Sequence, residues 1–221
     1  MELKAAIFDM DGTLIDSLMI WNVLWADMGE EYLQDKSFRP SAEDDKRVRT
    51  LTLADAMERI HRNYRIGKSG EELLDFANRL MIDFYSNRVM LKAGVREFLE
   101  HCRARGVKMC LATATAPALV RIALAHCDLE KYFSRIFSCG EIGKGKEHPD
   151  VFLQAQAFLG EPIGETFVVE DSLVAIETAT AAGFKTVGIF DPNNYGQEQI
   201  EKIATVYIPQ GKTLASLIDR A

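Results

Sequence analysis

Asp9 and Asp11 directly follow a short apolar run at residues 6–8, and Gly12 comes next. Side chains at positions i and i+2 of an extended chain point the same way, so both carboxylates lie on one side of the strand's carboxyl end. Neighbouring carboxylates repel each other unless a proton or a cation lies between them, and Mg²⁺ prefers oxygen ligands of this kind. The pattern therefore indicates a magnesium site. The alternative is a turn in which Asp and Gly only close the strand.

Three later segments carry polar groups at comparable places: Thr113 and Thr115 after a predicted strand, Lys144 and Lys146 before a predicted helix, and Glu170 with Asp171 after a second strand. Each has an ordinary reading, as a strand-end threonine, a solvated lysine or a helix-capping acid. However, the carboxyl ends of parallel strands line one crevice, so all of them are expected near Asp9. Acids, a hydroxyl and an ammonium together suit phosphoryl transfer, which depends on neutralising the phosphoryl oxygens.

The elements that position these residues alternate between apolar strands and amphipathic helices. We predict strands at 6–8, 107–113, 133–139, 166–170, 185–190 and 205–208, and helices at 94–105, from 117, at 149–158 and at 173–182. This alternation is typical of an α/β fold in which a parallel sheet is covered by helices on both faces.

The segment 17–88 interrupts the alternation, because it contains helical patterns and no convincing strand. Its predicted helix starts are Ser17, Thr52 with Asp55, and a capping box of Ser69 with Glu72. Apolar residues at helical spacing follow the first of these: Trp21, Leu24, Trp25 and Met28. We interpret 17–88 as an all-helical domain inserted as a lid, and 1–16 with 89–221 as the core.

Composition excludes several classes of function. The chain has 221 residues, 48% of them hydrophobic, and a formal net charge of -7 without a run of Lys or Arg. We therefore expect neither a nucleic acid nor a membrane as partner. The four cysteines lack any C-x-x-C spacing, which favours reduced core thiols. The sequence shows no leader and no run of membrane-spanning length, so we expect a cytoplasmic protein, and a monomer.

Four segments resemble, in order, the motifs of the haloacid dehalogenase superfamily of phosphatases: DMDGTLIDS at 9–17, LATAT at 111–115, GKGKEHPDVF at 143–152 and VVEDSLVAIETATAAG at 168–183. The helical insertion between the first two resembles the C1 cap of the subfamily that contains β-phosphoglucomutase and phosphoglycolate phosphatase. The resemblance implies a Rossmann-like, three-layer α/β/α core with an inserted helical cap domain.

The resemblance also implies roles for individual residues. Asp9 corresponds to the nucleophile that forms an aspartyl-phosphate, and Asp11 to the general acid and base. Mg²⁺ is expected on Asp9, the backbone carbonyl of Asp11 and Asp171, with Glu170 as an outer or water-mediated ligand. The transferring phosphoryl group is expected to contact Thr113, Ala114 and Lys146, with Lys144 as the second choice for the lysine.

Specificity is expected to come from the cap, where we choose Trp21 and Arg49 as substrate-binding residues. Further candidates are Trp25, Arg47, His61 and Arg65, although tryptophans fit the apolar stripe and arginines are common on exposed helices. His148 is interpreted as a loop residue.

We predict a Mg²⁺-dependent phosphatase that hydrolyses a small phosphorylated metabolite. One alternative is a β-phosphoglucomutase-like isomerase. Where those mutases carry a histidine and an arginine this chain has Trp21 and Leu53, but Arg47 and Arg49 lie close by in the sequence. A further alternative is a non-catalytic protein that binds a phosphorylated ligand.

Overall fold

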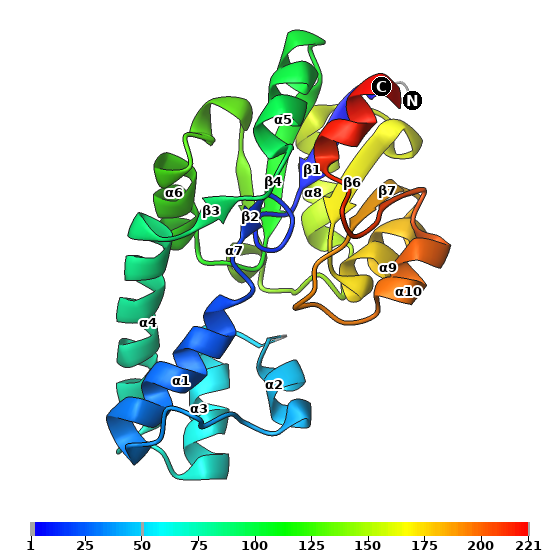
Figure 1. Cartoon of the computed structure of the whole chain (residues 1–221). Coiled ribbons are helices and arrows are strands. Elements are labelled where there is room, and N and C mark those ends of the chain that lie inside the picture. The colour runs from blue at the N-terminus through cyan, green and yellow to red at the C-terminus, as the bar shows by residue number, and fades with distance from the viewer. Residues whose placement is uncertain (1–2, 50, 221) are drawn as a thin grey trace. The chain divides into compact units, whose positions relative to one another are not determined.

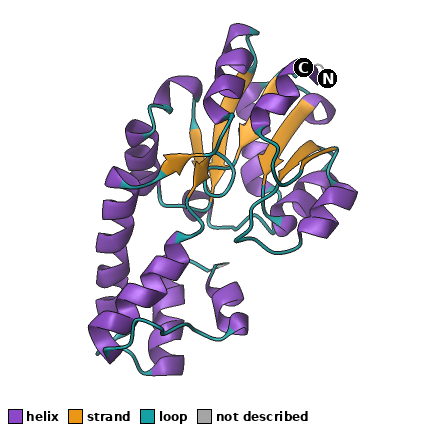
Figure 2. Cartoon of the chain, in the orientation of Figure 1, coloured by secondary structure: helices purple, strands orange, loops and turns teal. Residues whose placement is uncertain are grey.

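The computed structural model describes residues 3–49 and 51–220. They divide into two compact units. One unit, which we call the core, contains the chain up to Leu18 and from Val89 onward, and the other, the helical unit, is Met19–Arg88. Figure 2 shows that the strands belong to the first of these units.

The core is built on a six-stranded sheet in which all neighbouring strands are parallel. The order is β5-β4-β1-β6-β7-β8. The strands are β1 (Ala5–Phe8), β4 (Lys108–Thr113), β5 (Ile136–Ser138), β6 (Thr166–Glu170), β7 (Lys185–Ile189) and β8 (Val206–Ile208). Each corresponds to a predicted strand. β1 lies in the middle of the sheet, where Phe8 is beside Leu111 of β4 and Val169 of β6.

Side chains of β1 alternate between the two faces of the sheet, and each face is covered by helices (Figure 1). Ile7 belongs to the apolar cluster formed with α8 (Asp150–Leu159) and α9 (Leu173–Ala181). The next residue, Phe8, makes an edge-to-face contact with Phe98 of α5 (Val95–Ala104) on the opposite face. The predicted three-layer α/β/α core is therefore confirmed.

Shorter elements complete the core, and most of them carry too little pattern to be predicted. They are the antiparallel pair β2 (Ile15–Asp16) and β3 (Met90–Leu91), the helices α6 (Pro117–His126), α7 (Cys139–Ile142) and α10 (Gln197–Ile203), and the 3-10 turns η1 (Glu130–Tyr132), η2 (Ile163–Glu165) and η3 (Leu214–Arg220). α6 was predicted from Pro117, which occupies the first helical turn.

The helical unit consists of α1 (Ile20–Leu33), α2 (Ala42–Val48), α3 (Leu53–Tyr64) and α4 (Gly70–Asn87), and its described residues contain no strand. The Thr52 and Ser69 hydroxyls cap α3 and α4 as predicted. The capping box at α4 is shifted, because the Glu72 carboxylate accepts the N–H of Lys68. 

The predicted cap at Ser17 is wrong. α1 begins at Ile20 with no side-chain cap, and the Ser17 hydroxyl is bonded to Asp11 instead. The apolar spacing that indicated α1 defines which face is buried, but it does not define the first turn.

All four cysteines are free and buried, which confirms the interpretation as core thiols. Among the described residues, the longest apolar helical stretches fall short of what a membrane crossing requires.

Candidate active site

The site forms where β1 ends, between its two neighbours β4 and β6. Asp9 follows the last residue of β1, and its N–H donates to the carbonyl of Val169 in β6 at 2.9 Å. Strands to either side of β1 connect in opposite directions along the sheet, and such a switch point opens a crevice at the carboxyl edge. The sheet thereby brings residues that are more than 150 positions apart in sequence to the same place.

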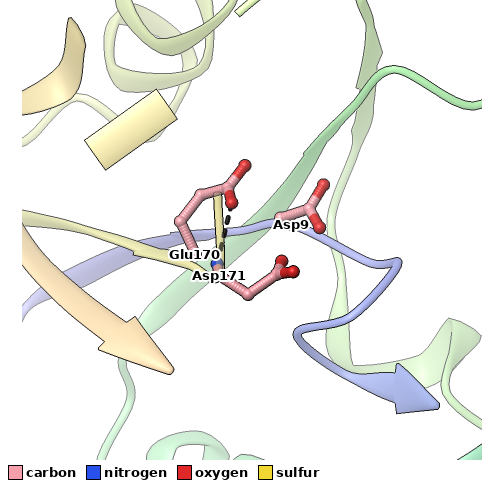
Figure 3. A group of neighbouring side chains, drawn as sticks. All are labelled: Asp9, Glu170 and Asp171. Atoms are coloured by element: carbon pink, nitrogen blue, oxygen red, sulfur yellow. Dashed lines mark hydrogen bonds between the residues drawn. The ribbon is translucent and has the colours of Figure 1, made fainter. Parts of the chain in front are cut away.

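Three buried carboxylates meet there: Asp9, Glu170 and Asp171 each offer one oxygen, and these oxygens lie within 4.8 Å of one another. Figure 3 shows Asp9 at the end of β1 and the other two at the end of β6. Burial raises the pKa of Asp9 well above its ordinary value, and Glu170, Asp171 and Asp11 raise it further, while Lys146 opposes them. Burial and then the charge of Glu170 raise the pKa of Asp171 to about 7. Without a cation, the environment therefore favours the protonated forms of Asp9 and Asp171.

Lys146 supplies the positive charge inside this group. Its ammonium donates to Asp9 Oδ1 and, at 2.5 Å, to Glu170 Oε1, and its side chain is only 11% exposed. Burial by itself disfavours the ammonium, but the two carboxylates overcome this and the pKa of Lys146 lies above its ordinary value. Lys144, the second choice, is exposed and forms an ion pair with Asp150 at 2.7 Å. The geometry thus places Lys146, and not Lys144, at the carboxylate group.

Asp171 is held by donors from two loops. The Thr13 hydroxyl donates to Oδ1 at 2.9 Å, and the Asn194 amide donates to Oδ2 at 2.8 Å. Gly12 lies against the same carboxylate with a φ of +81°, and a Cβ built there would be 2.3 Å from Asp171 Oδ2. Glycine is therefore required both by the backbone conformation and by the space.

Glu170 is already occupied by donors on both oxygens. Oε1 accepts from Lys146, and Oε2 accepts the backbone N–H groups of Asp171 and Ser172, each at 2.8 Å. Glu170 thus has fewer free lone pairs than a carboxylate with one donor on each oxygen, and its expected role as an outer ligand stays a prediction.

Asp11 lies beside the three carboxylates without belonging to their group. Its Oδ1 accepts the Ser17 hydroxyl at 2.7 Å, and its Oδ2 accepts the Thr115 hydroxyl at 2.8 Å. A hydroxyl can donate or accept, so these two partners can hold the carboxyl group whether or not it carries a proton. The side chain is thus placed apart from the three-carboxylate group, an arrangement that suits a proton carrier.

Thr113 is the last residue of β4, at the same edge of the sheet, and Ala114 follows it. The Thr113 side chain is buried, and its hydroxyl accepts the N–H of Thr115 at 3.0 Å, while Ala114 is exposed. The turn after β4 therefore presents small side chains, with Thr115 reaching Asp11.

The substrate residues predicted in the helical unit contact one another. The Arg49 guanidinium lies 5.9 Å from the centre of the Trp21 ring and forms an ion pair with Asp45 at 2.9 Å. Asp45 also accepts the indole N–H of Trp25 at 2.7 Å. Their assignment to substrate binding stays a prediction.

The remaining candidates have structural partners or lie on the surface. His61 Nδ1 is 2.8 Å from the carbonyl of Ile66, and Arg65 ends α3 in a left-handed conformation. Arg47 and His148 are exposed.

Sequence reasoning missed Asn194 and the ion pair between Lys92 and Asp191, whose atoms are 2.6 Å apart. Asn194 lies in the loop after β7, the next parallel strand beyond β6. A rule that inspected every strand end for polar residues would have included this loop.

The donor set fits a divalent cation of the Mg²⁺ type. Among the described residues, three buried carboxylates offer oxygen atoms here and the Lys146 ammonium is bonded to two of them, and Mg²⁺ prefers oxygen ligands. Asp9 and Asp171 are the carboxylates best placed to be direct ligands, because Glu170 accepts three hydrogen bonds while Asp171 accepts two from side chains and Asp9 accepts one.

Comparison with known proteins agrees with this chemistry. The family model of haloacid dehalogenase-like hydrolases matches residues 3–183. The chain is 31% identical to protein CbbY of Rhodobacter capsulatus, over 88% of each chain. It is 26% identical to a phosphorylated carbohydrates phosphatase of Thermotoga maritima, over 93% of this chain and 94% of that one.

Solved structures show the same fold. CbbY from Rhodobacter sphaeroides, crystallised in complex with phosphate, superposes with a TM-score of 0.78 at 18% identity, covering 98% of this chain and 96% of that one. The four motifs, the strand-end carboxylates and the match to the family model over most of the chain lead to one conclusion: the chain belongs to the haloacid dehalogenase-like hydrolases.

Proposed function

We propose that this enzyme is a Mg²⁺-dependent phosphatase that hydrolyses a small phosphorylated metabolite through an aspartyl-phosphate on Asp9. The observation that carries the proposal is the partly buried contact between Lys146 and Asp9, beside the carboxylates of Glu170 and Asp171. A nucleophilic carboxylate and a phosphate ester are both anions, so attack requires positive charge between them. Lys146 supplies one such charge at the nucleophile itself.

In the first step, an oxygen of Asp9 forms a bond to phosphorus while the ester P–O bond breaks. The Asp11 carboxyl group gives its proton to the departing alcohol oxygen. In the second step, Asp11 takes a proton from water as the water oxygen attacks phosphorus, and the bond to Asp9 breaks. Asp9 returns as a carboxylate, and inorganic phosphate is released.

The other residues hold these groups in place. Ser17 and Thr115 keep Asp11 at a fixed position in both protonation states, because each hydroxyl can donate or accept. Asp9, the backbone carbonyl of Asp11 and Asp171 would hold Mg²⁺, which supplies charge that offsets the phosphoryl oxygens.

The substrate class rests on the relatives, one of which is named for phosphorylated carbohydrates. We assign the choice of leaving group to the helical unit as a C1 cap, with Trp21 and Arg49 as its substrate-binding residues. Four free, buried cysteines support a reducing, cytoplasmic setting, and we propose a monomer.

The test is phosphate release from sugar phosphates, phosphoglycolate, nucleotides and an aryl phosphate, with Mg²⁺ and then with a chelator. We expect release that requires the metal and that is lost in Asp9→Asn. Release that survives the chelator would refute the metal requirement. Conversion of β-glucose 1-phosphate to glucose 6-phosphate with a bisphosphate primer, without net release, would favour the mutase instead. Binding of phosphate esters without either reaction would favour the non-catalytic alternative.

A further inference from the structure

Asn194, in the loop after β7, forms two hydrogen bonds with Asp171, a proposed metal ligand. The Asn194 amide nitrogen donates to Asp171 Oδ2 at 2.8 Å and to the backbone carbonyl of Asp171 at 3.2 Å. A single amide group therefore ties the end of the Asp171 side chain to its own backbone. That tie restricts rotation of the carboxylate about its side-chain bonds.

The loop is itself anchored by an ion pair. Lys92 lies 2.6 Å from Asp191, whose side chain is fully buried. The other oxygen of Asp191 accepts the N–H of Asn193 at 2.7 Å, and its backbone carbonyl accepts the N–H of Asn194 at 3.2 Å. These bonds fix the turn from which the Asn194 side chain projects.

The anchor reaches the loop after β1 as well. The backbone N–H of Lys92 donates to the carbonyl of Leu14 at 3.0 Å, one residue after Thr13. Thr13 holds Oδ1 of Asp171 while Asn194 holds Oδ2. The two donors to Asp171 therefore come from loops that are joined to each other through Lys92 and Asp191.

This arrangement leaves the carboxylate able to bind a cation. An ionised carboxylate accepts at about four lone-pair positions, and side-chain donors occupy one on each oxygen of Asp171. Lone pairs remain on both oxygens for the space shared with Asp9 and Glu170. Partners that orient a ligand in this way commonly determine how tightly the metal is held.

We propose that Asn194 is a positioning residue for Mg²⁺ binding, which fixes the Asp171 carboxylate in its ligating orientation through the loop anchored by Lys92 and Asp191. The inference rests on the proposed function, because it assigns Asn194 to the metal site of that reaction. A merely structural Asn194 would tie down the loop, and its loss would lower stability without changing the affinity for the metal.

The experiment compares Asn194→Ala and Asn194→Leu with the wild type and with Pro192→Ala. The leucine variant retains volume but lacks the donor, so it separates the hydrogen bonds from packing. Pro192 is exposed in the same loop, and its replacement adds conformational freedom to the unfolded chain while leaving the Asn194 side chain intact. The main readout is the Kd for MgCl₂ by isothermal titration calorimetry, with the melting temperature of the metal-free protein measured alongside.

We expect both Asn194 variants to bind Mg²⁺ at least about tenfold more weakly than the wild type, and Pro192→Ala to bind it normally. At saturating Mg²⁺ the KM for an aryl phosphate should be unchanged, because the inference places Asn194 on Asp171 and not on the substrate. The metal-free melting temperatures show that each variant is folded at the temperature of the titration.

Mg²⁺ affinities of both Asn194 variants within about twofold of the wild type would overturn the inference. So would normal affinity in Asn194→Leu alone, which would assign the effect to packing. A wild-type protein that binds Mg²⁺ but releases no phosphate would refute the proposed function, and the Kd comparison would still decide the role of Asn194. A wild-type protein that binds no Mg²⁺ would overturn the inference directly.

Discussion

Asp44 in the helical unit and Asp171 in the core are both buried aspartates with several hydrogen-bond donors, yet their pKa values shift in opposite directions. Burial acts to raise the pKa of Asp44, but donors from Tyr64, Arg59 and Asn63 overcome it and the pKa is lowered. The Asn194 and Thr13 donors to Asp171 do not overcome burial and the charge of Glu170, and its pKa is raised to about 7.

The difference lies in the charges around each carboxylate. Asp44 has Arg59 Nε at 2.6 Å and the Tyr64 hydroxyl at 2.8 Å, so its charge is matched within the helical unit. Asp171 lies among other acids, with Lys146 bonded to its neighbours. A carboxylate that is matched locally serves the fold. A carboxylate left among like charges lowers stability until a cation arrives, which is typical of a functional site.

The largest expected effect is the loss of turnover in Asp9→Asn. The amide keeps the shape but is not a nucleophile, so kcat should fall on the order of 10⁴-fold or more. Phosphate release and far-ultraviolet circular dichroism would show an inactive protein that is still folded. The same substitution at Asp150, whose partner is the surface residue Lys144, is the matched control and should leave kcat unchanged. Turnover by Asp9→Asn at the wild-type rate would remove Asp9 as the nucleophile.

The second effect is a pH dependence of stability that is largest without metal. Because the folded-state pKa values of Asp9 and Asp171 are raised, the folded protein binds their protons more tightly than the unfolded chain does. In chelator, the free energy of unfolding should therefore fall as pH rises from about 4 to about 7, by on the order of 4 kcal/mol at most from Asp171.

Urea unfolding at pH 5 and pH 8 would measure this slope. Asp171→Asn should flatten it, and Mg²⁺ should also reduce it in the wild type. Asp44 contributes in the opposite sense, since its lowered pKa gives stability that is lost only as pH falls below its ordinary value of 3.8. An unchanged slope in Asp171→Asn would contradict the raised pKa.

The third effect concerns Asp44, whose negative charge is balanced within the helical unit. Asp44→Ala should lower the free energy of unfolding by about 2 kcal/mol, because Arg59 and Tyr64 lose an ionised acceptor. Urea unfolding would measure the loss, and titration with MgCl₂ should give the wild-type affinity. Weakened Mg²⁺ binding in this variant would contradict the view that Asp44 stabilises the fold while Asp171 binds the metal.

The smallest effect concerns Ser17 and Ser69, which the sequence analysis both predicted to cap helices. Ser69 caps α4, so Ser69→Ala should cost about 1 kcal/mol of stability without changing kcat. Ser17 caps no helix and bonds to Asp11, so Ser17→Ala should lower kcat and leave helical content unchanged. Circular dichroism and phosphate release on both variants would measure this contrast, and the reverse pattern would restore the cap at Ser17.

The sheet was predictable because each strand is a short apolar run between turn residues, and the strands of a parallel sheet have both faces buried. β1 is buried throughout, and β6 likewise. The two-residue strands β2 and β3 were not predictable, since two residues carry no periodicity. The prediction that Ser17 caps a helix was wrong for a related reason, because a residue that can cap a helix can equally bond to a carboxylate nearby in space.

Within the site, the sequence indicated the residues that lie at strand ends, and the structure brings Asp9, Lys146, Glu170 and Asp171 together. Asn194 follows a strand end as well, but its bond to Asp171 and the Lys92–Asp191 pair depend on how three loops fold against one another, which no sequence pattern shows. Trp21 and Arg49 illustrate a further limit. Their mutual contact is compatible with packing in the helical unit as well as with a role in substrate recognition.

The positions of the four cysteines allow thiol reagents to detect local unfolding of the core. All four lie in the core, between residues 102 and 139, and burial raises the pKa of Cys102 and Cys110 to about 12. Thiol reagents attack the thiolate, so these side chains react only when the sheet and its covering helices separate. The rate of thiol modification therefore measures local unfolding of the core, and it does not detect unfolding that is confined to the helical unit.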